Sequence, residues 1–310
     1  RNATGGVILI NSKSPSFTPQ MDLGLSWAHY GRGSEGELNA QAFVTGPIID
    51  DVLAASLTLS SRELGSYVRN IATGRNTPDN HNRFLRAKLL FQPTDRIRLE
   101  GAFSYNREKN AIDLAYTNFR GANALAGLPG VVIANRPWQT SSDIDSYIDI
   151  DMKTYSLKAD FETELGTFTS MTGYIDYSTP IMQEADYSNF AGGVYDIFSF
   201  SKSFSQDVYF TSHPIGPVSF IAGLNYYRRK VGDDPAFINI PAFGYIDNIY
   251  NHSVNKSLSA FFEVTWKVTD RLKVIGGGRY TRDKNNGFAN GFNDVTPEAF
   301  LGEVKSKKFT

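Results

Sequence analysis

Hydrophobic and polar residues alternate with a period of two along most of the chain. In residues 257–268 almost every second residue is apolar, and polar residues fill most positions between them. Residues 96–105 and 155–165 repeat this alternation. Because successive side chains of a β-strand point to opposite faces, the period predicts strands with one apolar face and one polar face.

The alternation predicts about eleven strands, each of roughly ten residues or more. Globular strands average only ~5–6 residues, whereas about ten residues at a tilt near 45° cross the hydrocarbon layer of a membrane. Strand length therefore favours a membrane barrel over a soluble sandwich. The predicted strands are residues 21–30, 36–46, 52–63, 83–92, 96–105, 155–165, 167–177, 204–213, 217–229, 257–268 and 271–282.

Short and long connections alternate between these strands, and all 13 prolines fall at segment ends or between segments. This asymmetry is typical of outer-membrane barrels, which have tight turns on one rim and loops on the other. Soluble sandwiches and propellers also alternate, so a soluble β-rich ligand-binding protein stays open as an alternative. The predicted long loops are residues 64–82, 106–152, 178–200, 230–253 and 283–304.

Composition argues against several classes of function. The formal net charge is −1, whereas a nucleic-acid binder needs a basic surplus to neutralise phosphates. The chain has no Cys and only four His, none of them paired at i, i+4, which argues against thiol or histidine sites. The acidic clusters lack the spacing of a calcium loop. We therefore expect neither an enzyme nor a bound cofactor or metal.

The start of the chain carries a family motif. Residues 1–6 read Arg-Asn-Ala-Thr-Gly-Gly, an apolar run follows at residues 7–10, and a Lys-Ser-Pro sequence occupies residues 13–15. In this order, the segment resembles the end of the plug domain of TonB-dependent outer-membrane receptors, which leads into the first barrel strand. Further segments resemble that family in the same order along the chain, namely residues 44–51, 65–70, 204–207 and 261–284.

The resemblance covers nearly the whole chain and implies an all-β fold, an antiparallel up-and-down transmembrane β-barrel. Family barrels have 22 strands, so about 11–12 strands correspond to half of one. We therefore expect an internal fragment. Residues 1–16 would be the C-terminal end of a plug domain, and residues 17–310 would be the N-terminal half of the barrel, with a twelfth strand starting near residue 305.

The resemblance also implies a function. TonB-dependent receptors take up large scarce solutes across the outer membrane of Gram-negative bacteria, most often a ferric siderophore and otherwise cobalamin or glycans. The expected partners are outer-membrane lipid, the solute, and the TonB system, which would act through an N-terminal region outside this chain. A passive porin-like channel is the alternative among membrane barrels, but a porin has no plug-like start.

Residues that contact the solute are expected in the long loops. An Arg guanidinium can bind a carboxylate through two parallel hydrogen bonds, and an aromatic ring can stack on a planar ligand. The candidates for ligand binding are Arg107, Trp138, Tyr187, Tyr195, Arg228 and Arg229.

Overall fold

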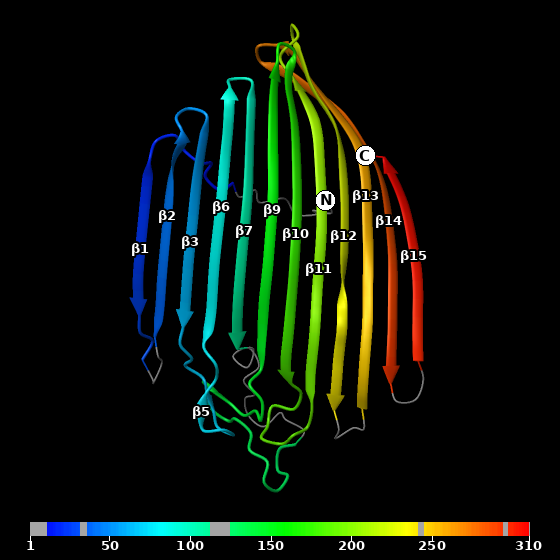
Figure 1. The fold of residues 1–310 in the computed structure, drawn as a ribbon. Helices are drawn as coiled ribbons and strands as arrows, with labels where there is room; N and C mark the ends of the chain where they lie inside the picture. Colours follow the sequence, from blue (N-terminus) through cyan, green and yellow to red (C-terminus); the bar gives the residue numbers. More distant parts are fainter. Residues whose placement is uncertain (1–10, 32–35, 112–124, 241–244, 294–296, 310) are drawn as a thin grey trace.

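The structure is a computed structural model that describes residues 11–31, 36–111, 125–240, 245–293 and 297–309. Twelve strands form one antiparallel sheet, in which each strand pairs with its neighbours along the chain (Figure 1). The predicted fold class is confirmed. The strands are β1 (Gln20–Ala28), β2 (Glu37–Ile49), β3 (Leu53–Leu64), β6 (Asn80–Thr94), β7 (Ile97–Ala111), β9 (Tyr147–Thr163), β10 (Gly166–Glu184), β11 (Val194–Ser212), β12 (Val218–Ile240), β13 (Tyr245–Thr269), β14 (Leu272–Asn293) and β15 (Pro297–Phe309).

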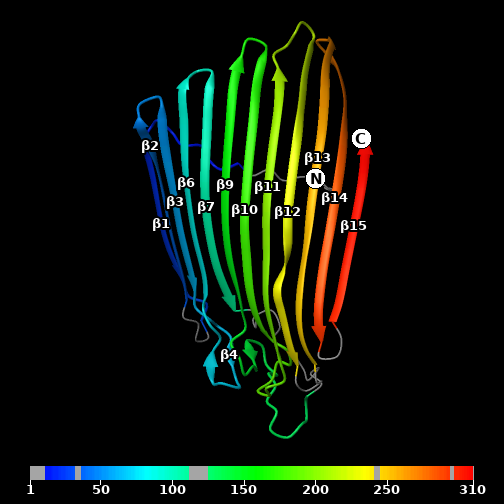
Figure 2. The same ribbon diagram turned by 45° about the vertical axis from the view of Figure 1, so that its right-hand side comes forward.

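The two ends of the strands differ. Tight turns join the strands at one end, and longer loops gather at the other, here called the loop rim (Figures 1 and 2). At the loop rim, β4 (Arg69–Asn70), β5 (Arg75–Asn76) and β8 (Gln139–Thr140) form a second, three-stranded sheet in the order β5-β4-β8. Because β4 and β5 follow β3 whereas β8 follows β7, the small sheet joins two loops that are distant in sequence.

Several strands extend further toward the loop rim than the sequence predicts. Residues 178–200, 230–253 and 283–304 are expected as long loops, but most of them belong to strands, so these predictions are wrong. The connection between β12 and β13, for example, is confined to residues 241–244. Polar residues occur on both faces of these extensions, and a period-two pattern therefore no longer marks the strand.

Two prolines, Pro180 and Pro235, lie well inside strands, contrary to the prediction from the sequence, whereas Pro47, Pro93 and Pro297 lie within two residues of a strand end. Pro180 in β10 is opposite Phe198 of β11. Pro235 in β12 lies where the pairing with β13 shifts register, between Asp233 and Ala236. A register shift leaves a position without regular pairing, where the missing N–H of proline removes no ladder hydrogen bond.

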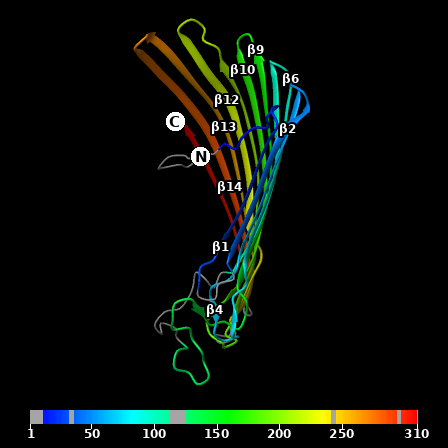
Figure 3. The same ribbon diagram turned by 90° about the vertical axis from the view of Figure 1, so that its left-hand side faces the viewer.

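The two faces of the main sheet have opposite environments. Residues 11–19 cross one face, here called the inner face, on the concave side of the sheet (Figure 3). On the other, outer face Leu258 is 54% exposed, whereas Ser257 and Ser259 on the inner face are only 2% exposed. Exposed leucine beside buried serine reverses the pattern of a soluble sheet, and a lipid-facing barrel wall requires this reversal.

Candidate functional site

A cavity of about 570 Å³ lies at the loop rim. Arg62 and Leu64 border it from the end of β3, and loop residues that follow β1, β3 and β7 complete it. The cavity thus combines three aromatic side chains and one guanidinium in a volume suited to a small molecule. Its lining residues are Tyr30, Gly31, Arg62, Leu64, Tyr67 and Trp138.

A hydrogen-bond network around Glu37 fixes one side of this cavity. Arg62 donates from Nε to Glu37 Oε1 at 2.7 Å, and Asn39 donates from Nδ2 to the same oxygen at 2.8 Å. The Tyr30 hydroxyl donates to Glu37 Oε2. This bond to a carboxylate raises the pKa of Tyr30 above its ordinary value, so the hydroxyl remains a neutral donor. The Arg62 side chain stays 53% exposed and accessible to a ligand.

Tyr67 and Trp138 form the opposite side. Their rings meet edge to face with centroids 5.4 Å apart, and the Tyr30 ring lies 6.5 Å from that of Tyr67. Trp138 has a φ of +64°, a left-handed conformation that costs a non-glycine residue about 1–3 kcal/mol. The small sheet holds it there, because Arg69 N donates to Trp138 O at 2.9 Å. Surroundings that enforce such strain are typical of ligand clamps.

Asn70 ties the loop that carries Trp138 to the loop that carries Tyr67. Its Nδ2 donates to Ser142 O at 2.8 Å, and its Oδ1 accepts a hydrogen bond from Ser142 N at 3.2 Å. Asn70 is buried, so both bonds are shielded from water. Ser142 Oγ also lies 3.2 Å from Glu184 Oε2. Asn70, Ser142 and Glu184 therefore connect three loops, and we call them the loop clamp.

Glu184 is a buried carboxyl at the loop end of β10, beyond the apolar band of the outer face. Burial raises the pKa of Glu184 to about 8, and its hydrogen bond with Asp143 adds to the rise. The geometry agrees with a protonated carboxyl. Ser142 Oγ has two acceptors within reach, Ile144 O at 2.5 Å and Glu184 Oε2 at 3.2 Å, but only one hydrogen to donate, so a proton on Glu184 Oε2 is compatible with this contact.

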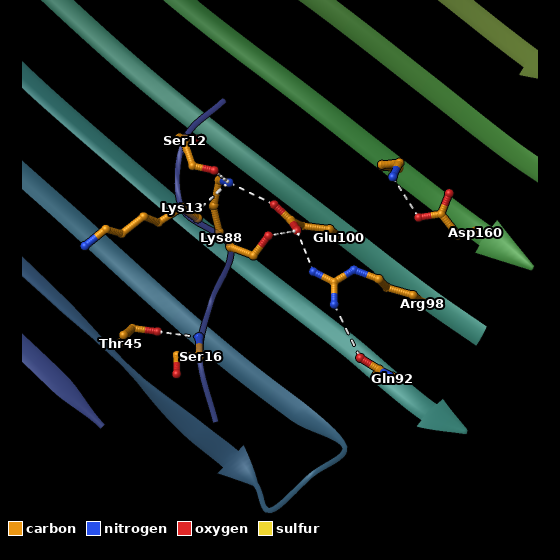
Figure 4. Close-up of polar contacts among 11 residues, drawn as sticks. Ser12, Lys13, Ser16, Thr45, Lys88, Gln92, Arg98, Glu100 and Asp160 are labelled. Atoms are coloured by element: carbon orange, nitrogen blue, oxygen red, sulfur yellow. Dashed lines mark hydrogen bonds and ion pairs between the residues drawn. The ribbon is translucent and has the colours of Figure 1, made fainter. Parts of the chain in front are cut away.

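Nearer the tight turns, residues 12 and 13 are bound to the inner face (Figure 4). Lys88 Nζ donates to Ser12 O at 3.3 Å, to Lys13 O at 3.0 Å and to Glu100 Oε1 at 2.8 Å. Lys88 is only 8% exposed. Its ammonium has three hydrogens, and each therefore has an acceptor, as a buried charge requires.

The next residues continue this attachment. Ser14 Oγ donates to Glu100 Oε2 at 2.6 Å, and Arg98 approaches the same oxygen at 3.3 Å. Ser16 N donates to Thr45 Oγ1 at 2.9 Å. The segment is thus held by hydrogen bonds, and ion pairs within the wall neutralise the charges of β6 and β7 locally. The family-like motif of residues 1–10 lies outside the described residues.

Of the six residues that the sequence predicts for ligand binding, the structure places one in the cavity, Trp138. Arg107 projects from the outer face, where its Nη2 donates to Asp149 Oδ2 at 3.1 Å. Arg228 is also on the outer face, two positions after Tyr226, the register partner of Leu258. Arg229 is on the inner face, and its Nε donates to a serine hydroxyl of β11 at 2.9 Å.

Tyr187 and Tyr195 come together around Gln183 rather than in the cavity. Gln183 Nε2 donates to the Tyr187 hydroxyl at 2.7 Å. Tyr195 is the register partner of Gln183 across β10 and β11. The predicted residues thus fall into separate places on the structure.

Sequence reasoning missed Tyr30, Arg62 and Tyr67. Tyr30 and Arg62 lie at the ends of predicted strands, and Tyr67 lies in the family-like segment at residues 65–70. Residues at the loop-rim ends of predicted strands could have been identified as candidates for the cavity. Adjacent strands bring such residues together even when they are distant in sequence.

No group of three or more His, Asp or Glu side chains in the described ranges could hold a metal ion. In the same part of the chain, no helix is long and apolar enough to cross a membrane.

These features define one wall of an up-and-down β-barrel, with an apolar outer face, a polar inner face and a loop-rim cavity. Residues 22–302 match the family described as TonB-dependent receptor-like, β-barrel, and the chain belongs to that family. It is 24% identical over 292 residues to the pesticin receptor of Yersinia enterocolitica, and 23% identical to that of Yersinia pestis. Each match covers 92% of this chain and 40% of the relative, so the chain spans about two fifths of their length.

Solved structures show the same fold. The ferric yersiniabactin uptake receptor FyuA of Yersinia pestis superposes with a TM-score of 0.77 at 16% identity, covering 96% of this chain and 44% of that one. The open form of the ferric-catecholate import receptor Fiu of E. coli K12 gives 0.68 at 12% identity, covering 96% and 52%. The siderophore receptor PiuA of Acinetobacter baumannii gives 0.67 at 10%, covering 96% and 47%.

Proposed function

We propose that the chain is part of a receptor that takes up a ferric siderophore across the outer membrane of a Gram-negative bacterium, with energy supplied through TonB. Residues 1–16 would be the end of its plug domain, and residues 17–310 the first half of its barrel. The observation that carries the proposal is the cavity that combines Trp138 and Tyr67 with Arg62. The receptor binds and releases its solute and catalyses no reaction.

The chemistry of the cavity suits an anionic chelate with aromatic groups. Flat rings, such as those of the catecholates named for one structural neighbour, can stack on Trp138 and Tyr67. Arg62 adds a positive charge, although its bond to Glu37 reduces that charge's net attraction. We therefore expect the aromatic contacts to supply most of the affinity and Arg62 to orient the ligand.

The attachment of residues 12–16 supports coupling to a movable plug. Hydrogen bonds exchanged for water cost only about 0.5–1.5 kcal/mol each, so work supplied through TonB can detach such a segment. A passive porin-like channel has no plug to detach, so it does not need an attachment of this kind. This contrast favours the receptor over the porin-like alternative.

The test measures binding of a ferric catecholate to the purified complete receptor, with quenching of tryptophan fluorescence as the readout. We expect saturable binding in the wild type. The Tyr67→Ala variant should bind roughly tenfold more weakly, because it removes a stacking ring. The Tyr67→Phe variant is the matched control, since it retains the ring and should bind within about threefold of the wild type. If Tyr67→Ala and the wild type bind the ferric catecholate with equal affinity, the solute does not bind in this cavity.

A further inference from the structure

A second, smaller cavity lies at the loop rim beside the cavity that Trp138 lines. Its volume is about 210 Å³. Arg62 and Leu64 border both cavities, so the two are adjacent. Sites for whole small molecules usually measure about 300–1,000 Å³, so the smaller cavity suits one group of a ligand. We call it the amide cavity, because its polar lining includes Asn80, Asn82 and Asn110, together with Glu108.

The register of the main sheet brings the polar side chains of the amide cavity together on the inner face. Arg62 of β3 is the register partner of Asn82 on β6, and Asn82 is that of Glu108 on β7. Asn82 is an even number of residues from Lys88, which binds residues 12 and 13 on the inner face. The other two carboxamides lie two residues from these positions on the same strands, and therefore on the same face.

Two hydrogen bonds hold Glu108 in place and leave part of its capacity unused. Asn110 Nδ2 donates to Glu108 Oε1 at 2.6 Å, and Asn82 Nδ2 donates to Glu108 Oε2 at 3.1 Å. No Lys, Arg or His of the described residues forms an ion pair with Glu108. An ionised carboxylate has about four lone-pair sites, so Glu108 can accept two further hydrogens from a ligand.

Asn80 adds a donor to the same cavity. Its Oδ1 accepts a hydrogen bond from Ala111 N at 2.7 Å, which fixes the side chain. The residue is only 9% exposed. Its Nδ2 has no hydrogen-bond partner among the described residues. Because a nearly buried donor without a partner costs free energy, a ligand group that accepts from Asn80 Nδ2 gains affinity.

The mixture of donors and acceptors decides which ligand group fits the amide cavity. An ammonium only donates hydrogen bonds, so it would leave Asn80 Nδ2 unpaired and would meet the charge of Arg62. A carboxylate or phosphate only accepts and would meet the charge of Glu108. A neutral group with several hydroxyls can donate to Glu108 and accept from Asn80, because each hydroxyl does both. His81 also borders the cavity, but its Nδ1 is bonded to Glu63.

We propose that the amide cavity binds a sugar group attached to the aromatic chelate that Trp138 and Tyr67 bind. The inference rests on the proposed function, since it assigns the polar part of the same ligand. The border that the two cavities share at Arg62 and Leu64 places the sugar directly beside the rings. A site built to bind hydroxyls rejects an analogue that lacks them, because its buried polar groups are then left unpaired. The receptor therefore selects a glycosylated chelate over its aglycone.

The experiment compares two ferric complexes of one catecholate, with and without a glucosyl group on its ring. Their dissociation constants for the complete receptor in detergent are measured by quenching of tryptophan fluorescence. The wild type should bind the glucosylated complex roughly 30-fold more tightly than the aglycone. Glu108→Gln should weaken binding of the glucosylated complex roughly tenfold, because a neutral amide accepts weaker hydrogen bonds than a carboxylate. Its affinity for the aglycone should stay within about twofold of the wild type.

The matched control is Asp207→Asn, which makes the same carboxyl-to-carboxamide change on the inner face outside both cavities. There Asn225 Nδ2 donates to Asp207 Oδ1 at 2.7 Å. This variant should keep the full preference for the glucosylated complex. Asn110→Ala is a second variant that removes a donor to Glu108 and should lower the preference about threefold. Unchanged affinity for the aglycone shows that each variant is folded.

Several results would overturn the sugar assignment. Equal binding of the two complexes by the wild type would do so while leaving the proposed function intact, since the aglycone still binds. Equal losses in Glu108→Gln and Asp207→Asn would assign the effect to the barrel wall in general. Tighter binding of a complex that carries an aminoethyl group instead of the glucosyl group would make the amide cavity a cation site. If neither complex binds, the proposed function itself fails, and this inference fails with it.

Discussion

The outer face carries charges in two regions at similar depth, and they are arranged in opposite ways. In the strands β3 to β9, cations are matched by carboxylates: Arg107 pairs with Asp149 at 3.1 Å and Lys153 with Asp151 at 3.3 Å. In the strands β11 to β15, cations are register partners of other cations, as at Arg228 and Lys256. In the first region the cations lie beside carboxylates, whereas in the second several cations lie directly opposite other cations.

The effect of a charged residue on stability therefore depends on the charges that lie beside it. Removing a matched cation leaves a carboxylate unpaired, so it should destabilise the sheet. Removing a cation from a directly opposed pair of cations relieves repulsion, so it should stabilise the protein. The following substitutions test that rule, beginning on the inner face where pairing is most buried.

Lys88→Met should give the largest loss of stability. The substitution leaves Glu100 with fewer cations and leaves two backbone carbonyls of the inner-face segment without a donor. Because breaking a buried ion pair is costly, we expect a free energy of unfolding lower by about 3 kcal/mol, measured by urea titration of the complete receptor in detergent. The control is Lys158→Met, whose pair with Asp160 is more exposed and should cost under about 1 kcal/mol. Equal losses in the two variants would contradict the assignment.

Charge-reversal substitutions should distinguish the two regions of the outer face, with smaller changes in the free energy of unfolding. Lys256→Glu places a carboxylate opposite Arg228 and should stabilise the receptor by about 1 kcal/mol. Lys153→Glu places a carboxylate beside Asp151 and opposite Asp176, and should destabilise it by a similar amount. Urea titration in detergent measures both changes in the free energy of unfolding. Shifts of the same sign would refute the distinction between the regions.

The loop clamp provides the smallest global effect, because it is confined to the loops. The folded-state pKa of Glu184 is raised from 4.5 to about 8. The folded loops therefore bind a proton that the unfolded chain releases, and the stability from Glu184 is full below about pH 4.5 and is lost as the pH rises toward 8.

Hydrogen exchange at the amides of Ser142 and Ala185 checks this pH dependence. After correction for intrinsic rates, protection should decrease between pH 5 and pH 8 in the wild type. Glu184→Gln carries no titrating proton and should show flat protection. An equally steep decrease in this variant would assign the effect to another group.

The sequence was sufficient to predict the central part of the main sheet. Every predicted strand lies largely within an observed one, because lipid on one side and polar contacts on the other impose a period of two. The ends of β10 to β15 were not predictable in this way, since beyond the membrane both faces meet water. The strands continue there because neighbouring strands still form hydrogen bonds, although the sequence no longer alternates between apolar and polar residues.

The candidate site was less predictable, for a related reason. Trp138 was identified by its type, but its neighbours Tyr30 and Tyr67 come from other loops that only the small sheet brings together. Arg107 and Arg228 were predicted as loop residues. Every second residue of a strand lies on the same face. Continuing the predicted strands by two residues past Tyr105 and Tyr226 would therefore have placed both arginines on the outer face.

The most direct test of the central claim is energy-coupled uptake through the loop-rim cavity. Radiolabelled ferric catecholate uptake is measured in cells whose only siderophore receptor is the complete protein, either wild type or Trp138→Ala, with and without TonB. The prediction is uptake by the wild type only when TonB is present, and uptake reduced roughly tenfold by Trp138→Ala at a subsaturating concentration. Uptake that persists without TonB, or that is unchanged by Trp138→Ala, would contradict the proposal.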